Sequence, residues 1–357
     1  MTVPGMEMSS PEIDPSSVAL DEPPEIPVGF PMPRNLALLD DRTPRVRVRT
    51  VVDRFPFPVP NGWFIVATGD ELSPGQIAAI HYFDRDLVVY RTEDGTPHTV
   101  DAYCPHLGAH LAVGGKVVDG NLACPFHGWR FDGTGACVEI PYAQTERIPT
   151  KARVRSYPTI ERNGMVWAWH HADEGDPFFE VPEVPELADA AWSPPRVVDF
   201  HISTSCQEMA ENNHDFAHFK YVHGAESIPD GEETIEGTYK RTISPGLERE
   251  TFGLGLGVVR VPGVVTFLSS VTPIDTDNVH VRWIFTVPAD SPPDLLDQVS
   301  EGFASGVTQD IPIWENKIYR PHPVLTKGEG GIALHRNWSR QFYSDPSVVD
   351  AAIGGDA

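Results

Sequence analysis

The chain has 357 residues, of which 27 are basic and 51 are acidic, so its formal net charge at neutral pH is −24. A surface of that sign repels nucleic acid and anionic membranes, which excludes both as expected partners. The length allows two domains of ordinary size, each with a buried core, and the hydrophobic content of 40% is normal for a globular protein.

Residues 1–44 are predicted to form an acidic, proline-rich N-terminal arm. Eight Pro and eight acidic residues fall in the first 41 positions, where Arg34 is the only basic side chain. Such a composition buries too little apolar surface to offset the entropy of ordering. The arm lacks the basic patch and apolar segment of a signal peptide, and no stretch approaches eighteen apolar residues. We therefore expect a cytoplasmic protein without a membrane span.

Residues 45–172 are predicted to form a small antiparallel β domain. Short runs of strand-forming residues alternate with turns, and Asp94-Gly95 marks a hairpin. The expected strands include 63–66, 77–83, 87–90, 98–100, 137–140 and 165–169. Loops carried by such a rigid sheet are common places for metal ligands.

Two segments of this domain, C-P-H-L-G-A-H and C-P-F-H-G-W, carry the most specific pattern of the chain. Cys104 and His106 form one pair of metal-ligating side chains, and Cys124 and His127 form the other. Pro follows each Cys and Gly follows the second His, so both arms are expected to be tight turns. Two facing arms of this kind could hold a [2Fe–2S] cluster, with both thiolates on one iron and both imidazoles on the other.

A structural zinc site is the alternative, because zinc also accepts two Cys and two His. Zinc fingers usually pair Cys with Cys and His with His, whereas each arm here is mixed. The pattern resembles the Rieske family. Rieske proteins of respiratory complexes carry an extra Cys in each arm, where this chain has Ala109 and Phe126, so the resemblance is to Rieske oxygenases and Rieske-type ferredoxins. Trp129 stands where high-potential members have a Ser, which implies a low reduction potential.

Residues 173–350 are predicted to form a second domain, entered through a connector rich in Pro and acidic residues. Strands flanked by helices indicate an α+β fold, a small antiparallel β domain followed by a helix-and-antiparallel-sheet, helix-grip-like domain. The segments expected are the connector at 173–192, helical character at 205–222, several strands at 234–288, and a helix at 295–317 that is interrupted near Pro312.

The segment E-N-N-H-D-F-A-H-F-K-Y-V-H contains His218 and His223, five residues apart. On an ideal helix that spacing places two side chains about 140° apart, so they share one ion only if the helix ends or distorts near Tyr221. Taken alone, such a pair is more often surface or core histidine than metal ligand. His214 lies off the motif and is expected to be structural.

Downstream of a Rieske motif, D-x-x-H-x4-H resembles the mononuclear iron motif of Rieske non-haem oxygenases. The resemblance implies that His218 and His223 are ligands of a mononuclear Fe(II), with Asp310 as the third ligand and Glu315 as the alternative carboxylate. It also implies a homotrimer in which Asp215 links the cluster of one subunit to the iron of the next. The alternative for either carboxylate is a solvated acidic helix face.

The C-terminal segments D-I-P-I-W-E-N-K-I-Y-R-P-H-P-V-L and R-N-W-S-R-Q-F-Y-S, and T-P-I-D at 272–275, are similar to the 3-ketosteroid 9α-hydroxylase oxygenases and cholesterol 7-desaturases. The resemblance implies a monooxygenase that hydroxylates a bulky, steroid-like substrate with O2, using electrons from a separate NAD(P)H-dependent reductase or ferredoxin. Desaturation, oxidative demethylation and an aromatic substrate stay open, because they need the same metal ligands. An electron-transfer protein with only the Rieske cluster, or a zinc-stabilised binding module, are alternatives of a different class.

Overall fold

The computed structural model describes residues 54–345, 347 and 350. The predicted N-terminal arm lies outside the described residues. The described chain forms antiparallel sheets and few helices, which confirms the predicted α+β fold class. No helix in this part of the chain is both long and apolar enough to cross a membrane.

The first half of the described chain forms three small antiparallel sheets. The first contains β1 (Gly62–Thr68), β11 (Met165–His170) and β10 (Thr159–Arg162). The second contains β2 (Ile77–Tyr82), β3 (Arg85–Arg91), β4 (Pro97–Asp101) and β9 (Ser156–Tyr157). The third contains β5 (Lys116–Val118), β6 (Asn121–Ala123), β7 (Arg130–Phe131) and β8 (Cys137–Glu139). Each of the predicted strands is present, and Gly95 lies at φ +95° in the predicted hairpin between β3 and β4.

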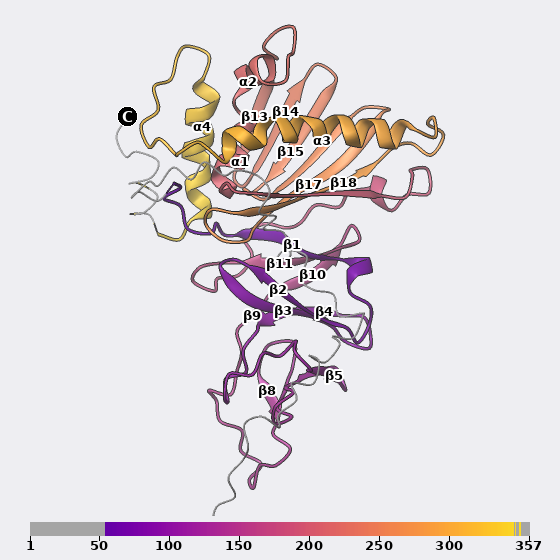
Figure 1. The fold of residues 1–357 in the computed structure, drawn as a ribbon, viewed down its shortest axis with the longest axis vertical. Coiled ribbons are helices and arrows are strands. Elements are labelled where there is room, and N and C mark those ends of the chain that lie inside the picture. Colours follow the sequence, from indigo (N-terminus) through magenta and orange to yellow (C-terminus); the bar gives the residue numbers. More distant parts are fainter. Residues whose placement is uncertain (1–53, 346, 348–349, 351–357) are drawn as a thin grey trace, which may run out of the picture. The chain divides into compact units, whose positions relative to one another are not determined.

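The second half is built on one seven-stranded antiparallel sheet with the order β12-β18-β17-β16-β15-β14-β13. Its strands are β12 (Arg196–Ile202), β13 (Glu232–Glu236), β14 (Tyr239–Ser244), β15 (Leu247–Phe252), β16 (Leu256–Val261), β17 (Val265–Pro273) and β18 (Val279–Thr286). Figure 1 shows the long helix α3 (Leu295–Trp314) crossing the strands of this sheet. Its apolar side packs on the sheet through Val299 and Phe303, which join the core around Phe267 and Phe285.

The helices differ from the expectation in three places. The predicted helical segment 205–222 is two short helices, α1 (Cys206–Asn212) and α2 (Phe216–Tyr221), because Asp215 starts a new helix as its N-cap. Helix α3 runs through Pro312 without the expected interruption and ends at Trp314. Helix α4 (Gly330–Ser339) was not expected from the sequence. The short 3-10 helices are η1 (Gly69–Glu71), η2 (Pro185–Leu187) and η3 (Arg340–Phe342).

The cores of the two halves are continuous. Phe64 and Val66 of β1 belong to the same buried cluster as Val271 of β17 and Val281 of β18. The Thr272 hydroxyl also donates a hydrogen bond of 2.9 Å to the carbonyl oxygen of Ile65. The predicted domain boundary near residue 172 therefore stays a prediction, because buried contacts of both halves meet across it.

Candidate functional site

The two predicted cluster arms have the same backbone design. In the first arm the amide of Gly108 donates to the carbonyl of Cys104 at 2.9 Å, and in the second the amide of Gly128 donates to that of Cys124 at 3.0 Å. Both glycines have positive φ, +75° and +71°, which a residue with a Cβ adopts at a cost. Each arm is thus a tight turn, as the sequence predicts, and each turn carries one Cys and one His.

The four predicted cluster ligands lie together. Cys104 and Cys124 are buried, and the rings of His106 and His127 have centroids 4.8 Å apart. The Nδ1 atom of His127 is buried and lacks a hydrogen-bond partner among the described residues. A buried nitrogen with an unused lone pair is costly, and coordination to a metal would satisfy it.

The donor set fits a two-iron cluster better than one zinc ion. In a tetrahedral zinc site all ligand atoms lie within about 4 Å of one another. In the described chain, no three of these four side chains place ligand atoms within 4.8 Å of one another. Burial, reinforced by the neighbouring Cys124, raises the pKa of the Cys104 thiol to about 11. A coordinating metal would remove such a proton outright, so the burial of Cys104 is compatible with a metal-bound thiolate.

Aromatic side chains surround the imidazoles of the arms. Trp129 stacks on His106 with centroids 4.6 Å apart and an interplanar angle of 6°, and its Nε1 donates to the Tyr142 hydroxyl at 2.9 Å. Leu107 and Phe126, beside the histidines, are 65% and 60% exposed. The tips of both arms are therefore apolar and uncovered in the single chain.

The second predicted site is built at the junction of α1 and α2. The Asp215 side chain caps α2 by accepting hydrogen bonds from the amides of Ala217 and His218. Helix α2 ends at Tyr221, so the chain turns before His223. Because the helix ends before His223, the separation of about 140° expected on a continuous helix does not apply, and both imidazoles can face one ion.

His218, His223 and Asp310 converge. One potential ligand atom from each lies within 4.8 Å of the other two, and this is the one such group of three found among the described residues. The distance between Nε2 of His223 and Oδ2 of Asp310 is 3.3 Å. Burial raises the pKa of Asp310, although the two histidines act in the opposite direction. Glu315, the alternative carboxylate, lies at the C-cap of α3 and is not part of the group.

Hydrogen bonds orient both imidazoles toward the same point. Nδ1 of His218 contacts the carbonyl oxygen of Asp215, and Nδ1 of His223 lies 3.2 Å from Oε1 of Gln309. Both partners are acceptors, so each Nδ1 carries the proton and each Nε2 keeps its lone pair for a metal ion. Two imidazole nitrogens and one carboxylate are the donor set of the ferrous facial triad, so the residues fit that ion.

Asn212 is a site residue that the sequence analysis did not find. Its Nδ2 lies 3.2 Å from Nε2 of His218 and 3.4 Å from Oδ2 of Asp310. Nothing in the spacing of the motif distinguishes this amide from the neighbouring Asn213. Its role depends on α1 and α3 meeting, which is a tertiary contact.

A cavity of about 640 Å³ opens beside the triad, and its size suits a ligand of drug or steroid dimensions. All three predicted iron ligands line it, together with residues of the large sheet and of α3. Its apolar wall includes Phe216, Phe219, Phe267, Trp283, Val299 and Phe303.

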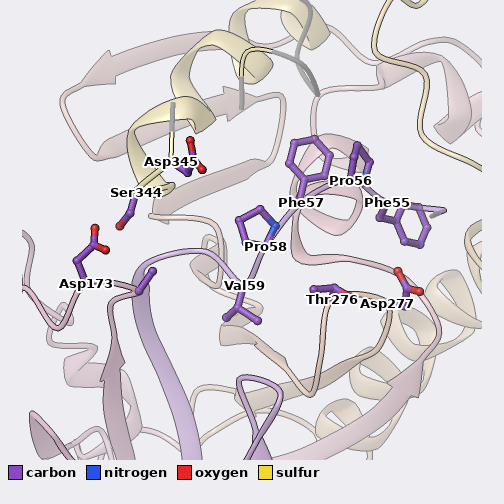
Figure 2. A pocket seen from close by; sticks show the side chains of 11 residues that line it. Phe55, Pro56, Phe57, Pro58, Val59, Asp173, Thr276, Asp277, Ser344 and Asp345 are labelled. Carbon is purple, nitrogen blue, oxygen red and sulfur yellow. The ribbon is translucent and has the colours of Figure 1, made fainter. Parts of the chain in front are cut away.

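A second hollow, of about 820 Å³, lies away from both sites. Figure 2 shows Asp173, Ser344 and Asp345 on one side of the segment 55–59, and Thr276 and Asp277 on the other. None of the predicted metal ligands lines this hollow, so the smaller cavity is the candidate substrate site.

Comparisons with known families divide the chain into two matches. Residues 62–158 match the Rieske [2Fe-2S] domain, and residues 168–343 match the 3-Ketosteroid 9alpha-hydroxylase C-terminal domain. Both matches agree with the resemblance seen in the motifs.

Curated relatives cover most of the chain. Cholesterol 7-desaturase nvd 1 of Ciona intestinalis is 32% identical over 84% of this chain and 72% of its own length. The probable 3-ketosteroid-9-alpha-monooxygenase, oxygenase component, of Rhodococcus rhodochrous is 30% identical over 86% of this chain and 84% of its own length.

Solved structures share the fold. Dicamba monooxygenase bound to dicamba aligns with a TM-score of 0.63 at 21% identity, over 79% of this chain and 97% of that one. NdmA of Pseudomonas putida CBB5 aligns with a TM-score of 0.64 at 21% identity, over 82% and 94%.

Proposed function

Because this chain belongs to the Rieske oxygenases, in the branch of the 3-ketosteroid 9α-hydroxylases and cholesterol 7-desaturases, we propose that it is a terminal oxygenase component that hydroxylates a steroid-like substrate. In the overall reaction one atom of O2 enters a C–H bond, and the other becomes water with two electrons and two protons. The observation that carries the proposal is the group of His218, His223 and Asp310 on the wall of a largely apolar cavity.

Eight residues of the two predicted domains would carry the metal chemistry, seven as ligands and one as a positioning residue. Cys104 and Cys124 would hold one iron of the cluster, and His106 and His127 the other. Bound there, the cluster and the ferrous ion would supply the one-electron transfers and O2 activation that no side chain performs. The mononuclear ligands are His218, His223 and Asp310, and Asp215 is the eighth residue, whose carbonyl fixes the ring of His218.

The residues of the site position the substrate and exclude water. The predicted ligands His218, His223 and Asp310 line one wall of the cavity, so a ferrous ion held by them would border the substrate space. The aromatic rings of Phe267, Trp283 and Phe303 pack against one another and form an apolar surface of the cavity. A flat polycyclic molecule would displace water from this surface and hold a C–H bond beside the triad.

We further propose a homotrimer, a cytoplasmic location and a separate NAD(P)H-dependent reductase or ferredoxin as electron donor. Support for the trimer comes from the exposed Leu107 and Phe126 at the arm tips and from Tyr221 of α2, which is 78% exposed. Apolar side chains in such positions are typical of a surface that another subunit covers. In that assembly Asp215 would link His127 of one copy to His218 of the next.

Desaturation is the second candidate activity, because several of the curated relatives are cholesterol 7-desaturases. It would use the same ligands and cavity, and would differ in removing two hydrogen atoms from the substrate. The position of the substrate relative to the triad would decide between the two outcomes.

The test is a single turnover of the chemically reduced protein with O2 and a panel of steroids, read by mass spectrometry. A product heavier by one oxygen atom is expected, and a product lighter by two hydrogens would replace hydroxylation with desaturation. His218→Ala is the matched control, which should keep the cluster spectrum and form no product. Reoxidation of the cluster without product from any steroid would refute the proposed substrate class.

A further inference from the structure

Arg249 is a cation in the wall of the substrate cavity. It lies on β15, where it pairs in register with Thr242 of β14 and Val259 of β16. Leu247, two residues earlier on the same face of the strand, also lines the cavity. The side chain is half-buried and lines the cavity.

No carboxylate of the described residues lies within 4 Å of this guanidinium, and its recorded hydrogen bond goes to the side-chain oxygen of Asn213. The acidic neighbours on the same strand, Glu248 and Glu250, face the other side of the sheet. There they pair with Arg241 and Arg260. The alternation of the strand therefore places two carboxylates on one face and leaves the cation alone on the cavity face.

Burial lowers the pKa of the Arg249 guanidinium to about 10, and no carboxylate opposes that shift. The group is still positively charged at neutral pH. A guanidinium has five N–H donors, and the bond to Asn213 uses one of them. A buried charge without a counter-ion is unfavourable, so a ligand that brings a carboxylate would gain both charge pairing and hydrogen bonds.

The rest of the cavity defines the other part of the ligand. Phe267, Trp283 and Phe303 supply an apolar aromatic wall beside the neutral Ser269. Apart from Arg249, the ionisable residues of the lining are the predicted iron ligands His218, His223 and Asp310. A ligand that matches both features has a rigid apolar body and one anionic end.

We propose that Arg249 binds a carboxylate of the substrate, so that the substrate is a steroid-like acid and not a neutral sterol. This inference rests on the proposed function, because it takes the cavity to be the substrate site. The guanidinium contacts Asn213, and the preceding Asn212 contacts His218 and Asp310. The acid group would thus be anchored at the same short segment that carries the iron ligands.

The experiment compares two steroid acids with their methyl esters, 5β-cholan-24-oic acid and 3-oxo-4-androstene-17β-carboxylic acid. Binding is measured by equilibrium dialysis to the full chain at neutral pH without reductant, so the readout does not depend on turnover. At least one acid should bind about ten- to a hundredfold more tightly than its ester, as expected for hydrogen bonds to a charged group.

Variants separate the role of Arg249 from general effects. Arg249→Met should bind acid and ester equally, with ester affinity unchanged, and Arg249→Lys should keep part of the preference for the acid. Arg241→Met is the matched control, because it removes a cation from the opposite face of the neighbouring strand and should keep the full preference. A purely structural role would weaken acid and ester binding alike and would overturn the inference.

The outcomes distinguish this inference from the proposed function. Equal binding of acid and ester by the wild type in both pairs, or a preference that persists in Arg249→Met, would overturn the carboxylate site even if the esters are oxidised. A preference for the acid that Arg249→Met abolishes would support the site even if no steroid yields a product on single turnover. Arg249-dependent binding of the acid without any product would refute the proposed activity and leave Arg249 as an anion-binding residue of the cavity.

Discussion

Replacing Asp310 with Ala is expected to lower the iron content from about three to about two atoms per chain. Asp310 is the carboxylate of the predicted triad, and its Oδ2 lies 3.3 Å from Nε2 of His223. Without it two neutral imidazoles are left, and a hard ferrous ion loses its anionic ligand. The cluster residues lie on other loops, so the visible absorption of the cluster should stay unchanged per protein chain.

The matched control for that change is Glu315→Ala. Glu315 lies on the same helix end, five residues later, but outside the group of ligand atoms. Iron is measured by colorimetry or plasma emission, and the cluster by its absorption and its electron paramagnetic resonance after reduction. About three iron atoms in Asp310→Ala, or a loss of one atom in Glu315→Ala, would refute the ligand assignment.

Four further predictions test the fold around the site and the proposed subunit interface. Arg336→Met should lower the free energy of unfolding in urea by roughly 3–5 kcal/mol, because the buried Glu211 carboxylate would lose its two hydrogen bonds of 2.7 and 2.8 Å. The double variant with Glu211→Met should recover most of this loss, because it leaves no unpaired carboxylate. Burial lowers the pKa of Lys240 to about 7, against 10.5 in the unfolded chain, so between these pH values only the unfolded chain keeps this proton. The free energy of unfolding should therefore rise with pH, by up to about 1.4 kcal/mol per pH unit. Lys240→Met should abolish this slope. Asp215→Asn keeps a good helix cap, so it should retain both metals and lose nearly all turnover, whereas wild-type turnover would exclude a relay role. Phe126→Glu should shift light scattering from trimer to monomer, and an unchanged mass would remove the arm tips from the interface.

The cluster arms could be predicted almost completely from the sequence because their determinants are local. Each arm is a turn of a few residues, with Gly108 and Gly128 at positive φ and the Cys and His within the same segment. The strands of the small sheets were equally readable from alternating apolar runs and turn residues. The mononuclear site needed the family resemblance, since Asp310 lies 87 residues beyond His223 and no local pattern connects them.

The support of the site could not be predicted, because it depends on pairs far apart in the sequence. Arg336 of the unpredicted helix α4 reaches Glu211 across 125 positions, and Arg249 reaches Asn213 across 36. In the sequence alone, Arg336, Glu211 and Arg249 look like ordinary surface charges. Only the packing of α4 and β15 against the α1–α2 junction brings Arg336 to Glu211 and Arg249 to Asn213.

The contacts at the end of α1 explain how so short a helix as α2 can hold the predicted ligand His218 in place. Helix α2 has six residues, too few to be stable by its own hydrogen bonds. The four residues before Asp215 each bind a different element of the fold. In chain order, Glu211 pairs with Arg336 of α4, Asn212 with Asp310 of α3, Asn213 with Arg249 of β15, and His214 with Glu233 of β13.

These four contacts fix the direction in which the chain enters α2, and therefore the position of the His218 ring. The same segment reaches the predicted iron through Asn212 and the predicted substrate anion through Asn213. A ligand that shifts Arg249 would then shift Asn213 and the adjacent Asn212, which contacts the predicted triad, without any change in the sheet. If both proposals hold, substrate binding and metal geometry would be connected through adjacent residues of one short segment. A substitution at Asn213 should then alter both the affinity for the acid, measured by equilibrium dialysis, and the iron content of the chain.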